Sequence, residues 1–145
     1  MPVKDIYHNT VIQALIADGW KITADPLYLK YGDRKLYVDL GAERETIAAE
    51  KKDEKIAAEI KSFLGSSAVD DLEDAVGQFS IYRAILDEIE PDRVLYLAVP
   101  ERVWGEVFND KFGQLILRSQ RLLLIIFDEK KARIVRWIKS PDIEK

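Results

Sequence analysis

Two acidic residues and a lysine occupy positions in this sequence where they could share one site on a sheet. Residues 55–61 (KIAAEIK) read as a strand, and side chains two positions apart on a strand project from the same face. Glu59 and Lys61 would therefore point the same way, with Ile60 directed into the core. A strand-end carboxylate beside a lysine can hold a divalent cation, while the ammonium group orients or stabilises the water that attacks a phosphodiester.

Asp39 is the candidate for a second carboxylate in the same site. It lies in an otherwise apolar strand segment, residues 37–40 (YVDL), where an ionised side chain needs a partner or a metal ion. Oxygen ligands of this kind suit Mg²⁺ or Mn²⁺, which lower the pKa of bound water and neutralise charge on the leaving oxygen. Two neighbouring carboxylates repel one another, and a cation or Lys61 would remove that penalty.

Three further polar residues stand on the elements that flank these strands. Gln78 and Tyr82 are four positions apart in a long expected helix, and so share one of its faces. His8, the only histidine, lies near the start of the first expected helix. Each of these residues, like the Glu59 and Lys61 pair, has an ordinary reading as a surface or half-buried side chain. Their joint order along the chain favours a common site.

The elements that would position these residues alternate between helix and strand. The pattern predicts a helix over 4–17, extended chain over 20–31 broken at Asp25-Pro26, a strand over 35–40, a hairpin of 46–50 with 55–61, a helix from a Ser67 cap to Pro91, a buried strand over 93–99, short helices over 100–108 and 112–119, and a closing hairpin of 122–127 with 132–138. We therefore expect an α/β fold, a mixed β-sheet flanked by helices.

Composition excludes several classes of protein. The 145 residues, 48% of them apolar, suit a single domain over 1–145. The absence of Cys and the single His exclude thiolate zinc and a multi-histidine zinc site within one chain. The N-terminus is polar, and no apolar run approaches the ~20 residues of a membrane span. We therefore expect a cytoplasmic protein without a membrane partner.

Charge is unevenly distributed. With 22 basic and 26 acidic residues the net charge is −4, which disfavours a protein that simply coats nucleic acid. Residues 111–139 nevertheless carry 8 basic and 2 acidic side chains, a net charge of +6. The C-terminal hairpin in this range could therefore follow a phosphate backbone. We expect local, salt-sensitive DNA binding. The apolar run 122–127, if it lay at a sheet edge, would need covering by a second copy, so we also expect a homodimer.

The order Asp39, Glu59-Ile60-Lys61, then Gln78 and Tyr82 resembles the PD-(D/E)XK nuclease superfamily, and His8 its RecB- and Cas4-type branch. The resemblance implies a restriction endonuclease-like fold, with an α-βββ-α-β core plus the C-terminal β-hairpin. It implies that Asp39, Glu59 and Lys61 are catalytic, that His8 joins the two acids as a metal ligand, and that Gln78 and Tyr82 support the site or contact DNA. The 20 positions between the acids exceed the compact hairpin of many members, so Glu50 is an alternative ligand.

Longer segments, in order along nearly the whole chain, resemble the XisH family, the fdxN element excision controlling factors. They are KDIYHNTVIQALIADGW, YVDLGAE, AAEIKSFLG, GQFSIYR, EPDRVLYLAVP and IVRWI. This resemblance implies an accessory protein of DNA rearrangement that acts with a small XisI-type partner and a recombinase during heterocyst differentiation. It leaves three alternatives open: a Mg²⁺- or Mn²⁺-dependent endo- or exodeoxyribonuclease, a catalytically silent regulator that binds DNA or protein, and the nuclease half of a toxin-like or defence pair.

Overall fold

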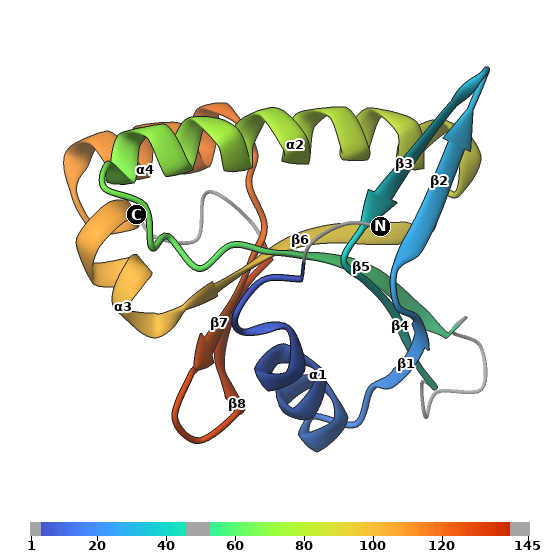
Figure 1. Ribbon diagram of the computed structural model, residues 1–145, viewed down its shortest axis with the longest axis horizontal. Coiled ribbons are helices and arrows are strands. Elements are labelled where there is room, and N and C mark those ends of the chain that lie inside the picture. Colours follow the sequence, from blue (N-terminus) through green and yellow to red (C-terminus); the bar gives the residue numbers. More distant parts are fainter. Residues whose placement is uncertain (1–3, 46–52, 140–145) are drawn as a thin grey trace.

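The computed structural model describes residues 4–45 and 53–139, which form a sheet covered by helices on both faces (Figure 1). Helix α1 covers one face, and α2 and α4 cover the other. In chain order the elements are α1 (His8–Ala17), β1 (Lys21–Ala24), β2 (Leu27–Tyr31), β3 (Arg34–Val38), β4 (Leu40–Arg44), β5 (Glu54–Ile60), α2 (Ala68–Ile89), β6 (Arg93–Pro100), α3 (Glu101–Val103), the π-helical turn η1 (Trp104–Phe108), α4 (Lys111–Ser119), β7 (Leu124–Asp128) and β8 (Arg133–Ile138).

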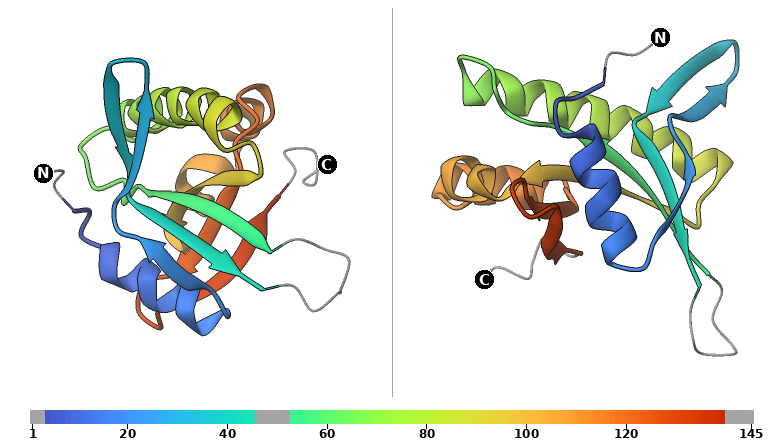
Figure 2. Two further views of the ribbon diagram at one scale, coloured as in Figure 1. Left: turned by 90° about the vertical axis from the view of Figure 1, so that its right-hand side faces the viewer. Right: turned by 60° about the horizontal axis from the view of Figure 1, so that its bottom comes forward.

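The main sheet has six strands in the order β1-β4-β5-β6-β7-β8. The central strands β5, β6 and β7 are parallel, while β1, β4 and β8 join antiparallel to their neighbours. Strands β2 and β3 form a separate two-stranded ribbon, which extends beyond α2 in both views of Figure 2. The expected mixed α/β architecture with helices on both sides of the sheet is therefore confirmed.

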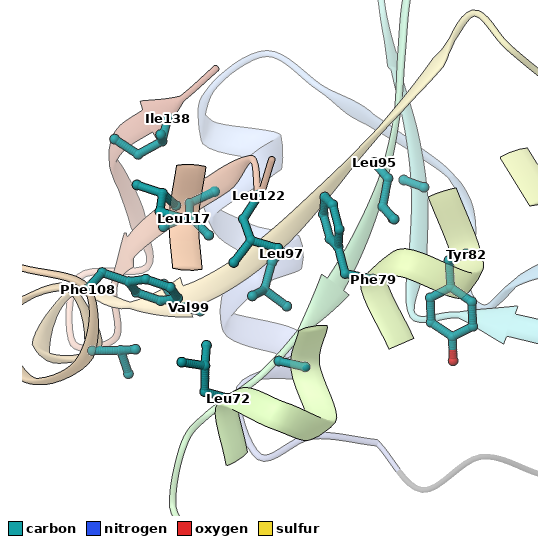
Figure 3. Close-up of a cluster of buried hydrophobic side chains, with 14 of the residues drawn as sticks. Leu72, Phe79, Tyr82, Leu95, Leu97, Val99, Phe108, Leu117, Leu122 and Ile138 are labelled. Atoms are coloured by element: carbon teal, nitrogen blue, oxygen red, sulfur yellow. The ribbon is translucent and has the colours of Figure 1, made fainter. Parts of the chain in front are cut away.

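The parallel strands are buried on both faces, as their nearly continuous apolar sequences predict. Alternate residues of β6 enter different cores. Leu95 and Leu97 join the core beneath α2 (Figure 3), whereas Tyr96 and Ala98 join the core beneath α1. Because side chains alternate along a strand, the site on β5 must face one of these two layers.

Helix α2 begins where its sequence predicts. The hydroxyl of Ser67 accepts a hydrogen bond from the backbone N–H of Asp70 at 3.2 Å, and acidic residues follow in the first turn, where they complement the helix dipole. The helix ends just before Pro91, and its buried face, which includes Leu72, Phe79 and Leu86, packs on the sheet. This long helix is the wall that carries Gln78 and Tyr82.

The strand expected over 35–40 is wrong in one respect, because the chain bends at Asp39. Strand β3 ends at Val38 in the ribbon, and β4 begins at Leu40 in the main sheet. Val38 belongs to the core beneath α2, and Leu40 to the core beneath α1. The antiparallel partner of β5 is β4. Residues 46–50, which the sequence predicts as the partner, lie outside the described part of the chain.

Strand β7 lies inside the sheet, with β6 on one side and β8 on the other. The apolar run over 122–127 is therefore not at a sheet edge, and the reason given for expecting a homodimer does not apply. Within the described ranges, no helix has the length and apolar character that crossing a membrane requires.

Candidate functional site

A cavity of about 370 Å³ lies at the C-terminal end of β5, between the base of the β2–β3 ribbon and α2. It brings together five of the residues expected in the site, namely Asp39, Glu59, Lys61, Gln78 and Tyr82. These come from the β3–β4 bend, the end of β5 and the middle of α2. Lys4, Asp5, Tyr37 and Ile60 complete the lining.

The two acids face each other across neighbouring antiparallel strands. Leu40 pairs with Ala58 in the β4–β5 register, which sets Asp39 opposite Glu59. The carboxylate of Glu59 accepts a hydrogen bond from the backbone N–H of Asp39 at 3.2 Å. The carboxylate of Asp39 accepts one from the N–H of Ile60 at 2.8 Å. Each acid is thus held by a backbone N–H of the other strand, which fixes both side chains at the end of the β4–β5 pair where β4 begins.

Burial raises the pKa of both acids. Burial, followed by the charge of Asp39, raises the pKa of Glu59 to about 8, although Lys61 acts in the opposite direction. Burial likewise raises the pKa of Asp39, against the hydrogen bond from Ile60 and the charge of His8. The pair therefore shares a proton at neutral pH, which a bound divalent cation would displace.

Lys61 follows β5 directly, and its backbone N–H donates to the carbonyl of Ala98 at 2.9 Å, which continues the pairing with β6. Its ammonium group lies close enough to lower the pKa of both Asp39 and Glu59. Main-chain pairing thus fixes the position from which this cation reaches the acids. That placement suits the stabilisation of negative charge that develops beside a carboxylate-bound cation.

Helix α2 contributes one amide and one hydroxyl to the cavity. The side-chain oxygen of Gln78 is buried and has no hydrogen-bond partner among the described residues. Tyr82 packs its ring against the core while its hydroxyl points away from the apolar cluster (Figure 3). Burial, followed by the charges of Glu59 and Asp39, raises the pKa of Tyr82 to about 12, so the hydroxyl stays protonated and able to donate.

His8 lies beside the cavity and is not one of its lining residues. Its imidazole is buried at 4% exposure, and its Nε2 lies 2.7 Å from a carboxylate oxygen of Asp25. The other ring nitrogen, Nδ1, is buried and has no hydrogen-bond partner within the described ranges. The charge of His8 lowers the pKa of Asp39, so the two interact electrostatically. Glu50 lies outside the described residues.

Sequence reasoning missed three lining residues. Asp5 accepts hydrogen bonds from Tyr7 N at 2.9 Å and Ser62 N at 3.1 Å, which ties the N-terminal segment to the end of β5. Tyr37 lies two positions before Asp39 on an expected strand, so strand alternation could have identified it. Asp5 and Lys4 precede the first helix and carry no pattern that would have separated them from other charged surface residues.

The donor set fits Mg²⁺ or Mn²⁺. Among residues 4–45 and 53–139, no group of three or more His, Asp or Glu side chains is placed to hold a metal ion. Mg²⁺, however, is commonly bound by one or two carboxylates together with waters and substrate phosphates. Asp39 and Glu59 supply two carboxylates in one cavity, and phosphate oxygens and water would supply the remaining ligands.

Comparison with known proteins adds the family. Residues 1–135 match the family model described as XisH protein. The chain belongs to the XisH family. The crystal structure of an XisH family protein from Nostoc punctiforme is 40% identical, with a TM-score of 0.84 over 92% of this chain and 99% of that one. The structure of an fdxN element excision controlling factor protein from Anabaena variabilis is 38% identical, with a TM-score of 0.82 over 93% and 99%.

No curated protein is significantly similar to this XisH-family chain. The two structural relatives match almost the full length of the chain, so this chain shares its overall fold with both.

Proposed function

We propose that this XisH-family protein is a metal-dependent deoxyribonuclease with a PD-(D/E)XK site on a restriction endonuclease-like core. The observation that carries the proposal is the convergence of Asp39, Glu59 and Lys61 in one cavity, with the two acids hydrogen-bonded to each other's strands. A buried pair of acids that retains a proton at neutral pH is typical of a functional site. This arrangement supports hydrolysis of DNA phosphodiesters.

Each residue has a distinct role in this reaction. Asp39 and Glu59 would hold Mg²⁺ or Mn²⁺, which when bound lowers the pKa of water and neutralises charge on the leaving oxygen. Lys61 orients the attacking water and stabilises the negative charge that develops on the phosphate. Tyr82 donates a hydrogen bond to a phosphate oxygen, and the unpartnered amide oxygen of Gln78 accepts one from water. His8 acts on Asp39 through its charge, with Asp25 fixing the orientation of its ring.

The biological role we propose is that of an accessory factor in DNA rearrangement. The Anabaena variabilis relative carries the name fdxN element excision controlling factor, which supports a role beside a recombinase in a differentiating cell such as a heterocyst. An XisI-type protein is the proposed partner, and the cytoplasm is the proposed compartment.

Purified protein incubated with linear, nicked and branched DNA in Mg²⁺ or Mn²⁺ tests the nuclease directly. We expect product with the native protein, none with Lys61→Ala, and undiminished product with Lys55→Ala, which changes a lysine at the other end of β5. Equal product from the native protein and Lys61→Ala would identify a contaminating nuclease and refute the proposal.

A catalytically silent regulator is the second candidate. It is favoured by the absence of a three-residue metal cluster within the described ranges and by the hydrogen bonds that already satisfy Asp39 and Glu59. A silent regulator would yield no product on any DNA. It would co-purify with an XisI-type protein and bind DNA equally well after Asp39→Asn and Glu59→Gln substitution. Loss of metal-dependent binding in these variants would count against it.

A further inference from the structure

The β2–β3 ribbon presents a basic face that begins at the candidate site. In its register Tyr28 pairs with Tyr37, and Lys30 with Lys35. Cross-strand partners share a face, and so do residues two apart, so these four side chains lie on one side of the ribbon. We define them as the lysine face. Tyr37 also lines the cavity that holds Asp39 and Glu59.

The opposite side of the ribbon anchors it to the protein. Leu29 and Val38 are fully buried in the core beneath α2, and Leu27 and Leu36 pack against the same core. On the same side of the ribbon, Tyr31 and Arg34 lie beyond these buried residues, next to the turn, and are exposed to solvent. The ribbon is therefore anchored by its apolar side, and both views of Figure 2 show it projecting from the body.

Lys30 and Lys35 form an unneutralised pair of like charges. They lie directly opposite each other and are both exposed, an arrangement of like charges that destabilises a sheet. Among residues 4–45 and 53–139, neither lysine forms an ion pair. Lys35 instead lies 4.3 Å above the ring of Tyr28, which itself packs edge-to-face on Tyr37. The charged groups of the tip, Lys30, Asp33, Arg34 and Lys35, sum to +2.

We propose that the lysine face is the surface that holds the DNA duplex against the candidate site. This inference rests on the proposed function. A polyanion is the ligand that relieves two adjacent unpaired lysines, and a two-stranded ribbon has dimensions that the major groove of B-DNA admits. The continuity through Tyr37 directs the bound backbone toward Asp39 and Glu59.

The spacing sets where the contact falls. Lys35 lies on β3 four residues before the bend at Asp39, which at a rise of ~3.4 Å per residue puts the two residues at most roughly 14 Å apart. Base pairs follow one another at ~3.4 Å along the duplex axis. The lysine face would therefore contact the backbone within about four base pairs of the phosphate in the cavity.

Salt dependence of duplex binding, measured by fluorescence anisotropy with chelator present, tests the inference apart from catalysis. Each phosphate contact contributes about 0.9 to the slope of log affinity against log salt. We expect Lys30→Gln/Lys35→Gln to reduce the magnitude of that slope by about 1.8. The matched control is Lys21→Gln/Lys55→Gln. It removes two charges from β1 and β5 of the main sheet, where both residues lie beside Glu43 of β4. It should leave the slope unchanged.

A third pair, Lys130→Gln/Lys131→Gln, tests the C-terminal hairpin as the competing surface. The inference would be overturned if the Lys130/Lys131 variant reduced the salt slope and the Lys30/Lys35 variant did not. Equal reductions in all three double variants would also overturn it. Equal competition by duplex RNA would assign the face to RNA instead. Thermal unfolding verifies folding, because removing the like-charge pair should leave the melting temperature equal or higher.

The two proposals fail in different assays. A ribbon-dependent slope without any cleavage by the native protein would refute the nuclease and leave the lysine face standing. Lys61-dependent cleavage, together with an unchanged salt slope in the Lys30/Lys35 variant, would refute the lysine face and leave the nuclease standing. A native protein that binds no duplex at any salt concentration would overturn the lysine face outright.

Discussion

The carboxylate of Glu59 accepts a hydrogen bond from the backbone N–H of Asp39 at 3.2 Å, one position before the first pair of the β4–β5 register, Leu40 with Ala58. The reverse bond runs from the N–H of Ile60 to Asp39 at 2.8 Å. Burial raises the pKa of both acids, and the charge of Asp39 further raises that of Glu59, so the pair retains a proton at neutral pH. The same bonds fix where a cation would be bound.

Substitution of Asp39 by Asn should abolish binding of Mn²⁺, as measured by calorimetry without DNA. In the native protein the cation must displace the shared proton. Its affinity should therefore rise with pH and level off above about 8, the pKa of Glu59. The heat of binding should also depend on the ionisation enthalpy of the buffer, since a proton is released. An affinity independent of pH would contradict the shared proton.

Stability should fall as pH rises through the range in which Glu59 ionises. The pKa of Glu59 is about 8 in the folded protein against 4.5 as its ordinary value, so the folded state binds more protons between these pH values. Each pKa unit corresponds to about 1.4 kcal/mol. The associated stability is fully present below pH 4.5 and is lost by about pH 8.

Glu59→Gln should flatten this dependence, as measured by urea unfolding at a series of pH values. Glu43→Gln, which lies on the neighbouring strand β4, is the matched control and should retain the native profile. Stability that rises with pH in the native protein would show that Glu59 is ionised in the folded state.

Tyr82→Phe should reduce DNA cleavage about tenfold without changing the unfolding transition. The ring stays in the core, while the hydroxyl that points away from the apolar cluster is lost. A hydrogen bond to a charged group contributes about 1.5–3 kcal/mol, and since ~1.4 kcal/mol is a factor of ten in rate, the lower end of this range gives the tenfold loss. Tyr96→Phe, in the core beneath α1, should cleave normally. Equal rates for the two variants would remove Tyr82 from the reaction.

Two glycines in helices should respond oppositely to alanine. At Gly113 an added Cβ would meet the carbonyl oxygen of Val107 and lie 2.5 Å from Phe108 Cα, backbone atoms that cannot move aside. Gly113→Ala should therefore lower the free energy of unfolding by more than about 2 kcal/mol. At Gly77 nothing lies within 4 Å of the added Cβ, so Gly77→Ala should raise it by about 0.5–1 kcal/mol. Equal effects in urea unfolding would contradict this packing around α4.

The sequence predicts the parts of the fold that depend on local pattern. The Ser67 cap, the length of α2 and the doubly buried strand β6 follow from helix signals and apolar runs. The bend at Asp39 does not, because residues 35–40 satisfy strand periodicity throughout and only the tertiary pairing divides them between ribbon and sheet. The interior position of β7 is likewise set by its neighbours and not by its own residues.

The candidate site follows the same division. Same-face spacing correctly groups Glu59 with Lys61 and Gln78 with Tyr82, and all four line the cavity. The pairing of His8 with Asp25 depends on a contact between residues 17 positions apart, which no spacing rule addresses. Asp5 enters the cavity through its bond to Ser62, at a separation of 57 positions.

Because of the bend at Asp39, the geometry of the acid pair depends on how the two hydrophobic cores are positioned relative to each other. Val38 is held by one core and Leu40 by the other. A small displacement of one core relative to the other would therefore move Asp39, which lies between them. Interiors transmit such strain because they are closely packed. Loosening either core should therefore disable cation binding while the protein is still folded, and function should be lost at a lower temperature than structure.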